Sequence, residues 1–277
     1  MHGDVSLPCL VLILGLGMRI EEWPQEAVAD LARDFRVICI DNRDSGRSGR
    51  CGPNVDSAAV RTLESGAPYG EEPLPYTLFD MRDDVLRVLN ELQIGRFAVA
   101  GFSMGGMIAQ LVAAQASSRV TGMVQICSSA GEVAAPVPEV TWQRFLKNAR
   151  PFESRDALIR WLAEDLTWCS APSPLADAVD AAEAMVDGGY TPGGYARQLL
   201  ALSQSGDRSA YLTQITCPAL VIGAAQDRCI EPDSSRLAQR LIPDAELVIC
   251  GNTGHALEPQ VMAHLSSWLR KTLIQRH

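Results

Sequence analysis

The residues Phe97–Met107, with the sequence FAVAGFSMGGM, contain the pattern that decides how this chain folds. A short apolar run, predicted to be a buried strand, leads directly into the pentapeptide Gly101-Phe102-Ser103-Met104-Gly105, and residues of helical composition follow. A serine at such a sharp strand-to-helix turn takes strained dihedral angles, and flanking glycines let neighbouring backbone approach closely. The position of the pentapeptide therefore predicts that Ser103 is a nucleophile. The alternative interpretation is a helix-capping serine in an ordinary turn.

Apolar runs like the one before Ser103 recur along the chain, each about five to seven residues long and bounded by Gly, Pro or Asp. Continuous apolar runs are typical of parallel strands that are covered on both faces. Helical patterns separate most of them, the clearest at 77–92, where Thr77 and Asp80 form a capping box. This alternation predicts an α/β fold with a doubly wound, mostly parallel sheet. The expected strands are 9–14, 36–40, 96–101, 122–128, 218–223 and 245–250.

One interval interrupts the alternation, because no convincing strand lies between 128 and 218. We expect a catalytic core made of 1–131 and 213–277, with 132–212 inserted as a helical cap. Residues 50–76, rich in Gly, Pro, Ser and Glu, are expected to form a long mobile loop. The helices expected in the cap are 139–149, 154–169, 175–187 and 193–205.

The cap is rich in aromatic side chains, with eight of the sixteen in the chain. This enrichment predicts an apolar roof over a substrate pocket, although about half of these side chains are expected to pack the core of the cap itself. The candidate pocket residues are Gly17, Phe102, Trp142, Phe145, Trp161 and Trp168.

Composition limits the kinds of partner. With 277 residues and a net charge of −9, the chain is one large domain with an insertion, and nucleic acid is an unfavourable partner. The eight cysteines form no C-x-x-C pair and several lie in apolar runs, which indicates reduced thiols in a cytoplasmic protein. The start lacks a signal-peptide pattern, and the apolar run near it is too short to span a membrane. We expect a monomer or homodimer that binds a small molecule.

A serine nucleophile needs a base and an orienting acid. Of the four histidines, His2 and His277 are terminal and His264 lies in an amphipathic helical pattern, whereas His255 lies in a glycine-rich loop after the last expected strand. Asp227 follows the preceding strand, so the order is Ser…Asp…His, with each residue after a strand of its own. Glu132 is a weaker candidate for the acid.

The oxyanion of an acyl-transfer intermediate needs backbone donors. The amide after the nucleophile belongs to Met104, and a second donor is expected from the glycine-containing loop after the first strand, at Leu16. No metal or organic cofactor is needed for such a site.

Together these motifs resemble the α/β-hydrolase fold family over essentially the whole chain. The segment Asp41–Ser48 is similar to the family's D-x-R-G-x-G-x-S turn, and Asp44 in place of its first glycine is closest to a bacterial subgroup that includes aclacinomycin methylesterases; serine-dependent macrolide esterases belong to the same broad family. The resemblance implies hydrolysis of a carboxylic ester, with a bulky polyketide or macrolide as the suggested substrate. Leu14-Gly15 stands where most relatives have His-Gly. Relatives also have two antiparallel strands before the first strand found here, and their absence would leave strand 36–40 at an exposed edge.

Several activities use this scaffold. Serine at 103 argues against haloalkane dehalogenases and epoxide hydrolases, which use a carboxylate nucleophile. A serine esterase or lactonase is the leading hypothesis. Serine C–C hydrolases, perhydrolases and acyltransferases stay open, as does an amidase. A non-catalytic small-molecule receptor is the alternative from another class.

Overall fold

The computed structural model describes residues 1–277 except 67–68, 70–72, 132–136, 171–174 and 275–277. Its centre is a six-stranded sheet in the order β2-β1-β3-β4-β5-β6, and all five pairings between these strands are parallel. The predicted parallel α/β sheet is therefore confirmed, with each strand within about two residues of its expected bounds. The strands are β1 (Cys9–Ile13), β2 (Arg36–Ile40), β3 (Phe97–Phe102), β4 (Val120–Ile126), β5 (Ala219–Ala224) and β6 (Glu246–Cys250).

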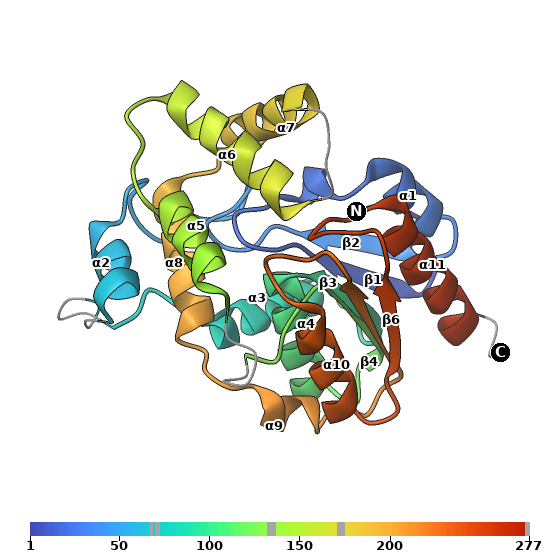
Figure 1. The fold of residues 1–277 in the computed structure, drawn as a ribbon. Helices are drawn as coiled ribbons and strands as arrows, with labels where there is room; N and C mark the ends of the chain where they lie inside the picture. Colours follow the sequence, from blue (N-terminus) through green and yellow to red (C-terminus); the bar gives the residue numbers. More distant parts are fainter. Residues whose placement is uncertain (67–68, 70–72, 132–136, 171–174, 275–277) are drawn as a thin grey trace.

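Helices cover both faces of the sheet (Figure 1). On one face α1 (Gln25–Leu31) and α11 (Pro259–Leu273) share an apolar cluster with the strands. The other face is covered by a larger cluster that includes side chains of α3, α4, α9 and α10. Every residue of β1, β3 and β5 is buried, which explains their continuous apolar sequences. The helices of the second face are α3 (Leu78–Glu91), α4 (Met104–Gln115), α9 (Ser209–Leu212) and α10 (Pro232–Leu241).

Strand β2 lies at one edge of the sheet, as expected for 36–40. Its outer side is met at one point by the start of the chain, where His2 and Val37 form an isolated antiparallel bridge. The two backbone hydrogen bonds of this bridge measure 2.9 and 2.8 Å. A single bridge covers only part of an edge strand.

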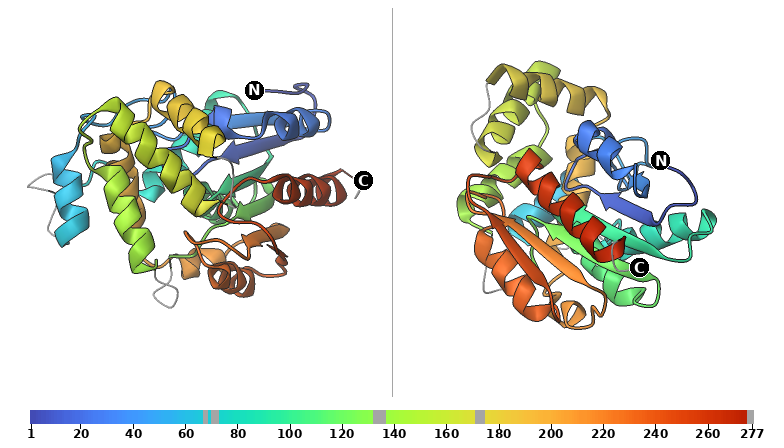
Figure 2. Two further views of the ribbon diagram at one scale, coloured as in Figure 1. Left: turned by 45° about the horizontal axis from the view of Figure 1, so that its top comes forward. Right: turned by 90° about the vertical axis from the view of Figure 1, so that its right-hand side faces the viewer.

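The predicted helical insertion lies between β4 and β5. Its helices share an apolar cluster of their own, separate from the two clusters that cover the sheet. Figures 1 and 2 show α6 and α7 side by side, standing apart from the strands. The bounds are α5 (Glu139–Ala149), α6 (Arg155–Cys169), α7 (Leu175–Asp187) and α8 (Pro192–Ser203).

The expectation of a continuous loop over 50–76 is wrong for Ser57–Ser65, which form helix α2. Asp56 caps this helix by accepting a hydrogen bond from the Ala59 amide, and Gly66 ends it with a left-handed φ of 67°. Its apolar side packs into the cluster of the inserted helices. The turn-forming residues on either side concealed a short amphipathic helix whose apolar partners are distant in sequence.

None of the helices in the described ranges has the length and apolar character that crossing a membrane requires.

Candidate active site

Ser103 lies at the turn from β3 to α4 with φ 55° and ψ −122°, outside the regions that side chains normally favour. The turn is held by the end of β4 and the residues after it: the Ser103 amide donates to the Ile126 carbonyl at 2.9 Å, and the Ser128 hydroxyl donates to the Ser103 carbonyl at 2.8 Å. A Cβ on Gly101 would collide with the carbonyl of Gly105. The glycines of the pentapeptide are thus required by close backbone contact, and the strain at Ser103 is imposed by its surroundings.

The two predicted oxyanion donors flank this serine. Met104 is the first residue of α4, so its amide has no acceptor within the helix. Leu16 belongs to the loop after β1, and a Cβ on the adjacent Gly15 would lie 3.4 Å from the Ser103 hydroxyl oxygen. The loop is fixed by the Gly17 amide, which donates to Gln198 at 2.7 Å. The assignment of the Leu16 and Met104 amides as oxyanion donors stays a prediction, which this placement supports.

Asp227 and His255 meet across the carboxyl ends of β5 and β6. The His255 Nδ1 lies 2.7 Å from Asp227 Oδ2, and the other carboxylate oxygen accepts the amides of Cys229 and Ile230 at 2.8 Å each. The Asp227 side chain is 1% exposed and that of His255 is 11% exposed. Since the ionised carboxylate is an acceptor, this hydrogen bond requires a proton on Nδ1, and Nε2 is the ring nitrogen outside the contact.

Two adjoining cavities open beside Ser103, of about 190 and about 130 Å³. Of these two, the second and smaller is the one that His255 and Phe102 line, and the ring centroids of these two residues are 4.8 Å apart. Ser103 and His255 therefore border the same space. The residues that line both cavities are Leu16, Ser103, Phe145 and Cys229.

The predicted pocket residues divide into two groups. Phe102 and Phe145 line the cavities, whereas Gly17 and the three cap tryptophans are outside both linings. Trp161 donates its indole N–H to Asn148 at 2.6 Å, and Trp168 stacks with Arg144 and Arg228, whose guanidinium carbons lie 4.8 and 5.8 Å from its ring. Trp142 packs on the apolar cluster of the inserted helices, and a Cβ on Gly17 would press on the rings of Tyr190 and Tyr195.

The second cavity is lined instead by residues outside the predicted pocket set, although its two tyrosines belong to the aromatic side chains of the cap. They include two buried tyrosines and several aliphatic residues of α6 and α7. Period-3.6 spacing placed all of them except Tyr190 on helices, and Tyr190 lies between α7 and α8, but which side chains face a cavity depends on packing. They are Leu162, Leu166, Met185, Tyr190 and Tyr195. Glu132, the weaker acid candidate, lies outside the described residues.

One group in the described ranges has a donor set that could bind a metal, namely Cys127, Asp227 and His255, whose donor atoms lie within 4.8 Å of one another. Two of these atoms already satisfy each other in the Asp227–His255 hydrogen bond. Burial, reinforced by the nearby Asp227 carboxylate, raises the pKa of the Cys127 thiol well above its usual range, which disfavours the thiolate that a metal prefers. The geometry fits a hydrogen-bonded acid–base pair better than a metal site.

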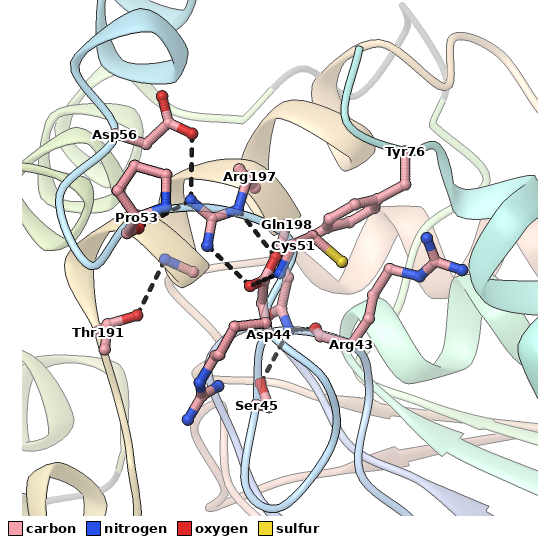
Figure 3. Close-up of polar contacts among 12 residues, drawn as sticks. Arg43, Asp44, Ser45, Cys51, Pro53, Asp56, Tyr76, Thr191, Arg197 and Gln198 are labelled. Atoms are coloured by element: carbon pink, nitrogen blue, oxygen red, sulfur yellow. Dashed lines mark hydrogen bonds and ion pairs between the residues drawn. The ribbon is translucent and has the colours of Figure 1, made fainter.

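A second buried polar cluster joins α8 to the loop after β2 (Figure 3). The Arg197 side chain, 1% exposed, donates to both oxygens of Asp44 at 2.9 and 2.7 Å and to Asp56 at 3.1 Å. Asp44 takes a left-handed φ of 68° and also accepts the Tyr76 hydroxyl at 2.8 Å. Burial alone would raise the pKa of Asp44, but the hydrogen bonds from Arg197, the Cys51 amide and Tyr76 hold it below its usual value.

Gln198 extends this cluster toward Ser103. Its amide nitrogen donates to the Arg43 carbonyl at 2.7 Å and to the Ser45 hydroxyl at 2.8 Å, while its oxygen accepts the Gly17 amide. One buried side chain of α8 thus connects the loop after β2 with the loop that contains Leu16. Asp44 occupies the position where the family's turn has glycine, and its ion pair with Arg197 accounts for a carboxylate there.

The fold and the geometry of the site define an α/β hydrolase, and comparison with known proteins agrees. The sequence model of the alpha/beta hydrolase fold family matches residues 8–257, so the chain belongs to this family. Rhodomycin D methylesterase DnrP of Streptomyces peucetius is 28% identical over 293 aligned positions, which cover 92% of this chain and 87% of the relative. The resemblance seen in the motifs is confirmed, and the family and this relative indicate an enzyme that hydrolyses esters.

Solved structures show the same fold. The enol-lactonase of Burkholderia xenovorans LB400 has a TM-score of 0.76 with 23% identity, covering 99% of this chain and 95% of its own. A thermophilic esterase of Thermogutta terrifontis has a TM-score of 0.72 with 23% identity, covering 98% and 92%.

Proposed function

We propose that this protein is a serine carboxylic-ester hydrolase that acts through Ser103, His255 and Asp227. The observation that carries the proposal is the 2.7 Å hydrogen bond between Asp227 and His255 Nδ1, beside a serine held in a strained turn. This bond fixes the tautomer in which Nε2 accepts a proton, and both His255 and Ser103 border one cavity.

The chemistry proceeds in two halves. Ser103 attacks the ester carbon while His255 Nε2 takes the hydroxyl proton, and the negative charge that develops on the carbonyl oxygen is bound by the Leu16 and Met104 amides. His255 then gives its proton to the departing alkoxide, which leaves an acyl-enzyme. A water molecule activated by His255 releases the acid and restores the serine.

The two cavities suggest how the ester lies. The leaving oxygen must receive a proton from His255, so the alcohol half belongs in the cavity that His255 lines. The acyl half then occupies the larger cavity, where Met107, Val137 and Leu202 supply apolar contacts. Both halves have room for several heavy atoms, which favours an apolar ester or lactone of substantial size.

The substrate class follows from this shape and from the methylesterase relative. We propose a bulky apolar ester or lactone, such as a polyketide or a macrolide antibiotic, acted on in the cytoplasm without metal or cofactor. A methyl ester would fill the larger cavity and leave most of the smaller one to water.

The nucleophile is tested with a fluorophosphonate probe, which labels activated serines. Native protein should be labelled rapidly, and Ser103→Ala should not be labelled. Ser203→Ala, an exposed serine at the larger cavity, is the matched control and should keep its labelling. Equal labelling of Ser103→Ala and the native protein would overturn the assignment.

The substrate proposal is tested with methyl and benzyl esters of the same aromatic acid, together with a macrolide lactone. Filling the His255 cavity should give the benzyl ester at least about tenfold higher kcat/KM, since two buried methylene equivalents at about 0.8 kcal/mol each already exceed the roughly 1.4 kcal/mol of a tenfold effect. Leu166→Trp should remove that preference while sparing the methyl ester. A uniform preference for methyl esters would instead indicate a methylesterase with the larger cavity as its main binding site.

A further inference from the structure

Two cysteines from distant parts of the sequence meet at the smaller cavity. Cys169 ends α6 and Cys229 lies in the loop after β5, yet their sulfur atoms are 3.0 Å apart. Both line the cavity, so a small molecule that enters it reaches them. Cys169 is half-buried and Cys229 is buried. The pair lies beside the proposed acid–base residues, although neither thiol has a role in ester hydrolysis.

Each thiol belongs to a backbone segment that holds one member of the Asp227–His255 pair. The Cys229 amide donates to Asp227 Oδ1 at 2.8 Å, and the Cys169 carbonyl accepts the His255 amide at 2.8 Å. A change in the distance between the two sulfurs is therefore transmitted to the groups that position the carboxylate and the imidazole. The two sulfurs are 60 residues apart in sequence, so their contact joins the end of α6 to the loop after β5, beside the stacking of Trp168 on Arg228.

We propose that Cys169 and Cys229 are a modification site at which a peroxide forms a reversible disulfide and so lowers hydrolysis. A disulfide bond is about 2.05 Å long, so the sulfurs approach by about 1 Å. Such a displacement next to the acid–base pair is of a size that impairs catalysis. The formation of the bond does not depend on the proposed function, whereas its effect on turnover rests on that function.

The chemistry balances with hydrogen peroxide as the oxidant. The more accessible Cys169 attacks the peroxide, forming a sulfenic acid and releasing one water. Cys229 then attacks that sulfur, its proton leaves with the hydroxyl as a second water, and the S–S bond forms. Two thiols have lost two electrons and two protons, and the peroxide has become two waters. The hydrogen bond with Cys169 and burial raise the pKa of the Cys229 thiol well above its usual range, so Cys229 is the poorer first nucleophile and Cys169 is the thiol that the peroxide oxidises.

The covalent change is tested on the full chain with hydrogen peroxide, followed by thiol counting and mass spectrometry of peptides under non-reducing conditions. Two of the eight thiols should be lost, with one linked pair of peptides containing Cys169 and Cys229, and dithiothreitol should reverse the change. Closing a long loop should also raise Tm by about 5–10 °C. A peptide linked through other cysteines, or oxidation of Cys169 alone, would overturn the proposal.

Two variants and a probe distinguish formation of the disulfide from its effect on the reactivity of Ser103. Cys169→Ala should form no linked peptide, while Cys51→Ser, an exposed cysteine that contacts neither sulfur, should form it as the native protein does. Oxidation should slow fluorophosphonate labelling of Ser103 about tenfold in native protein, and not in Cys169→Ala. Linked peptide with unchanged labelling would overturn the coupling. Failure of all ester hydrolysis, with the linked peptide present, would count against the proposed function and not against the disulfide.

Discussion

Two buried carboxylates, Asp44 and Asp227, have opposite surroundings although their side chains are equally hidden, at 0% and 1% exposed. Asp44 faces the permanent charge of Arg197, which donates to it twice. Asp227 faces the imidazole of His255, which uses one nitrogen in this hydrogen bond and itself lines the cavity. A buried polar cluster whose members satisfy one another stabilises the fold, whereas one with an unused basic group beside a cavity is equipped for chemistry.

The comparison predicts different losses from similar substitutions. Removing a charge from the Arg197 cluster should cost stability, because the remaining charge is left buried without its partner. Replacing Asp227 with an isosteric amide should lower turnover, because the amide no longer orients His255. It should leave stability nearly unchanged, because the hydrogen bonds that hold the loop survive.

The largest effect is expected for Asp227→Asn. The amide oxygen can still accept from Cys229 and Ile230, but the amide nitrogen now faces His255 and favours the wrong tautomer. We expect kcat for a p-nitrophenyl ester to fall about 10⁴-fold, with Tm changed by only a few degrees.

Asp233→Asn is the control for this substitution, because Asp233 is exposed on α10 and pairs only with Arg236. Its kcat and Tm should match those of the native protein. If Asp227→Asn keeps activity within about tenfold of the native value, another acid orients the histidine, and Glu132→Gln becomes the decisive variant.

A stability effect of about 3–5 kcal/mol is expected for Arg197→Met, which leaves Asp44 and Asp56 charged and buried. This corresponds to a fall in Tm of about 10 °C. Adding Asp44→Asn to Arg197→Met should recover part of the loss, since it removes one of the two buried charges that Arg197 had paired. Thermal unfolding of the two single variants and the double variant measures the coupling.

The exposed ion pair of Arg155 and Asp187 is the matched control, with side chains 49% and 68% exposed. Arg155→Met should cost less than about 1 kcal/mol. A Tm for Arg197→Met close to that of Arg155→Met would show that the buried cluster does not stabilise the fold, and the comparison with Asp227 would fail.

The sequence predicted one of these clusters and not the other, for a physical reason. Ser103, Asp227 and His255 each follow a strand in a turn with its own local signature, and parallel strands bring their carboxyl ends to one edge. Arg197 has no local signature, because it lies 153 residues from Asp44 and 141 from Asp56. The contacts of Arg197 depend on how α8 packs against the loop after β2.

The same reason separates the predicted pocket residues. Phe102 adjoins Ser103 in the chain, so its place at the cavity follows from the turn itself. Trp161 and Trp168 lie on α6, where rotation of the helix decides which side chains face inward, and hydrogen bonding and stacking with polar groups hold both indoles outside the cavity linings. Helix existence could be read from spacing, but helix orientation could not.

The smallest expected effect concerns Glu22, a third carboxylate, which lines the His255 cavity and accepts the Arg19 amide at 3.0 Å. Burial raises the pKa of Glu22 to about 7, against a usual value of 4.5. The folded protein therefore binds more protons than the unfolded chain between pH 4.5 and 7, so this group makes stability fall as pH rises through that window.

Glu22→Gln keeps an acceptor for the Arg19 amide and removes the titration. Relative to the native protein, the variant should gain stability as pH rises from 4.5 to 7, by at most about 3 kcal/mol, and the difference should stay constant above pH 7. Urea unfolding at pH 4.5, 6, 7 and 8 measures this difference, with the more exposed neighbour Glu21→Gln as the control. Parallel stability curves for native protein and Glu22→Gln would show that folding does not raise the pKa of Glu22. A diverging pair would place Glu22 between the two clusters: its nearby cation, Arg19, does not offset the cost of burial as Arg197 does for Asp44, so the cavity acquires a negative charge as pH rises through about 7.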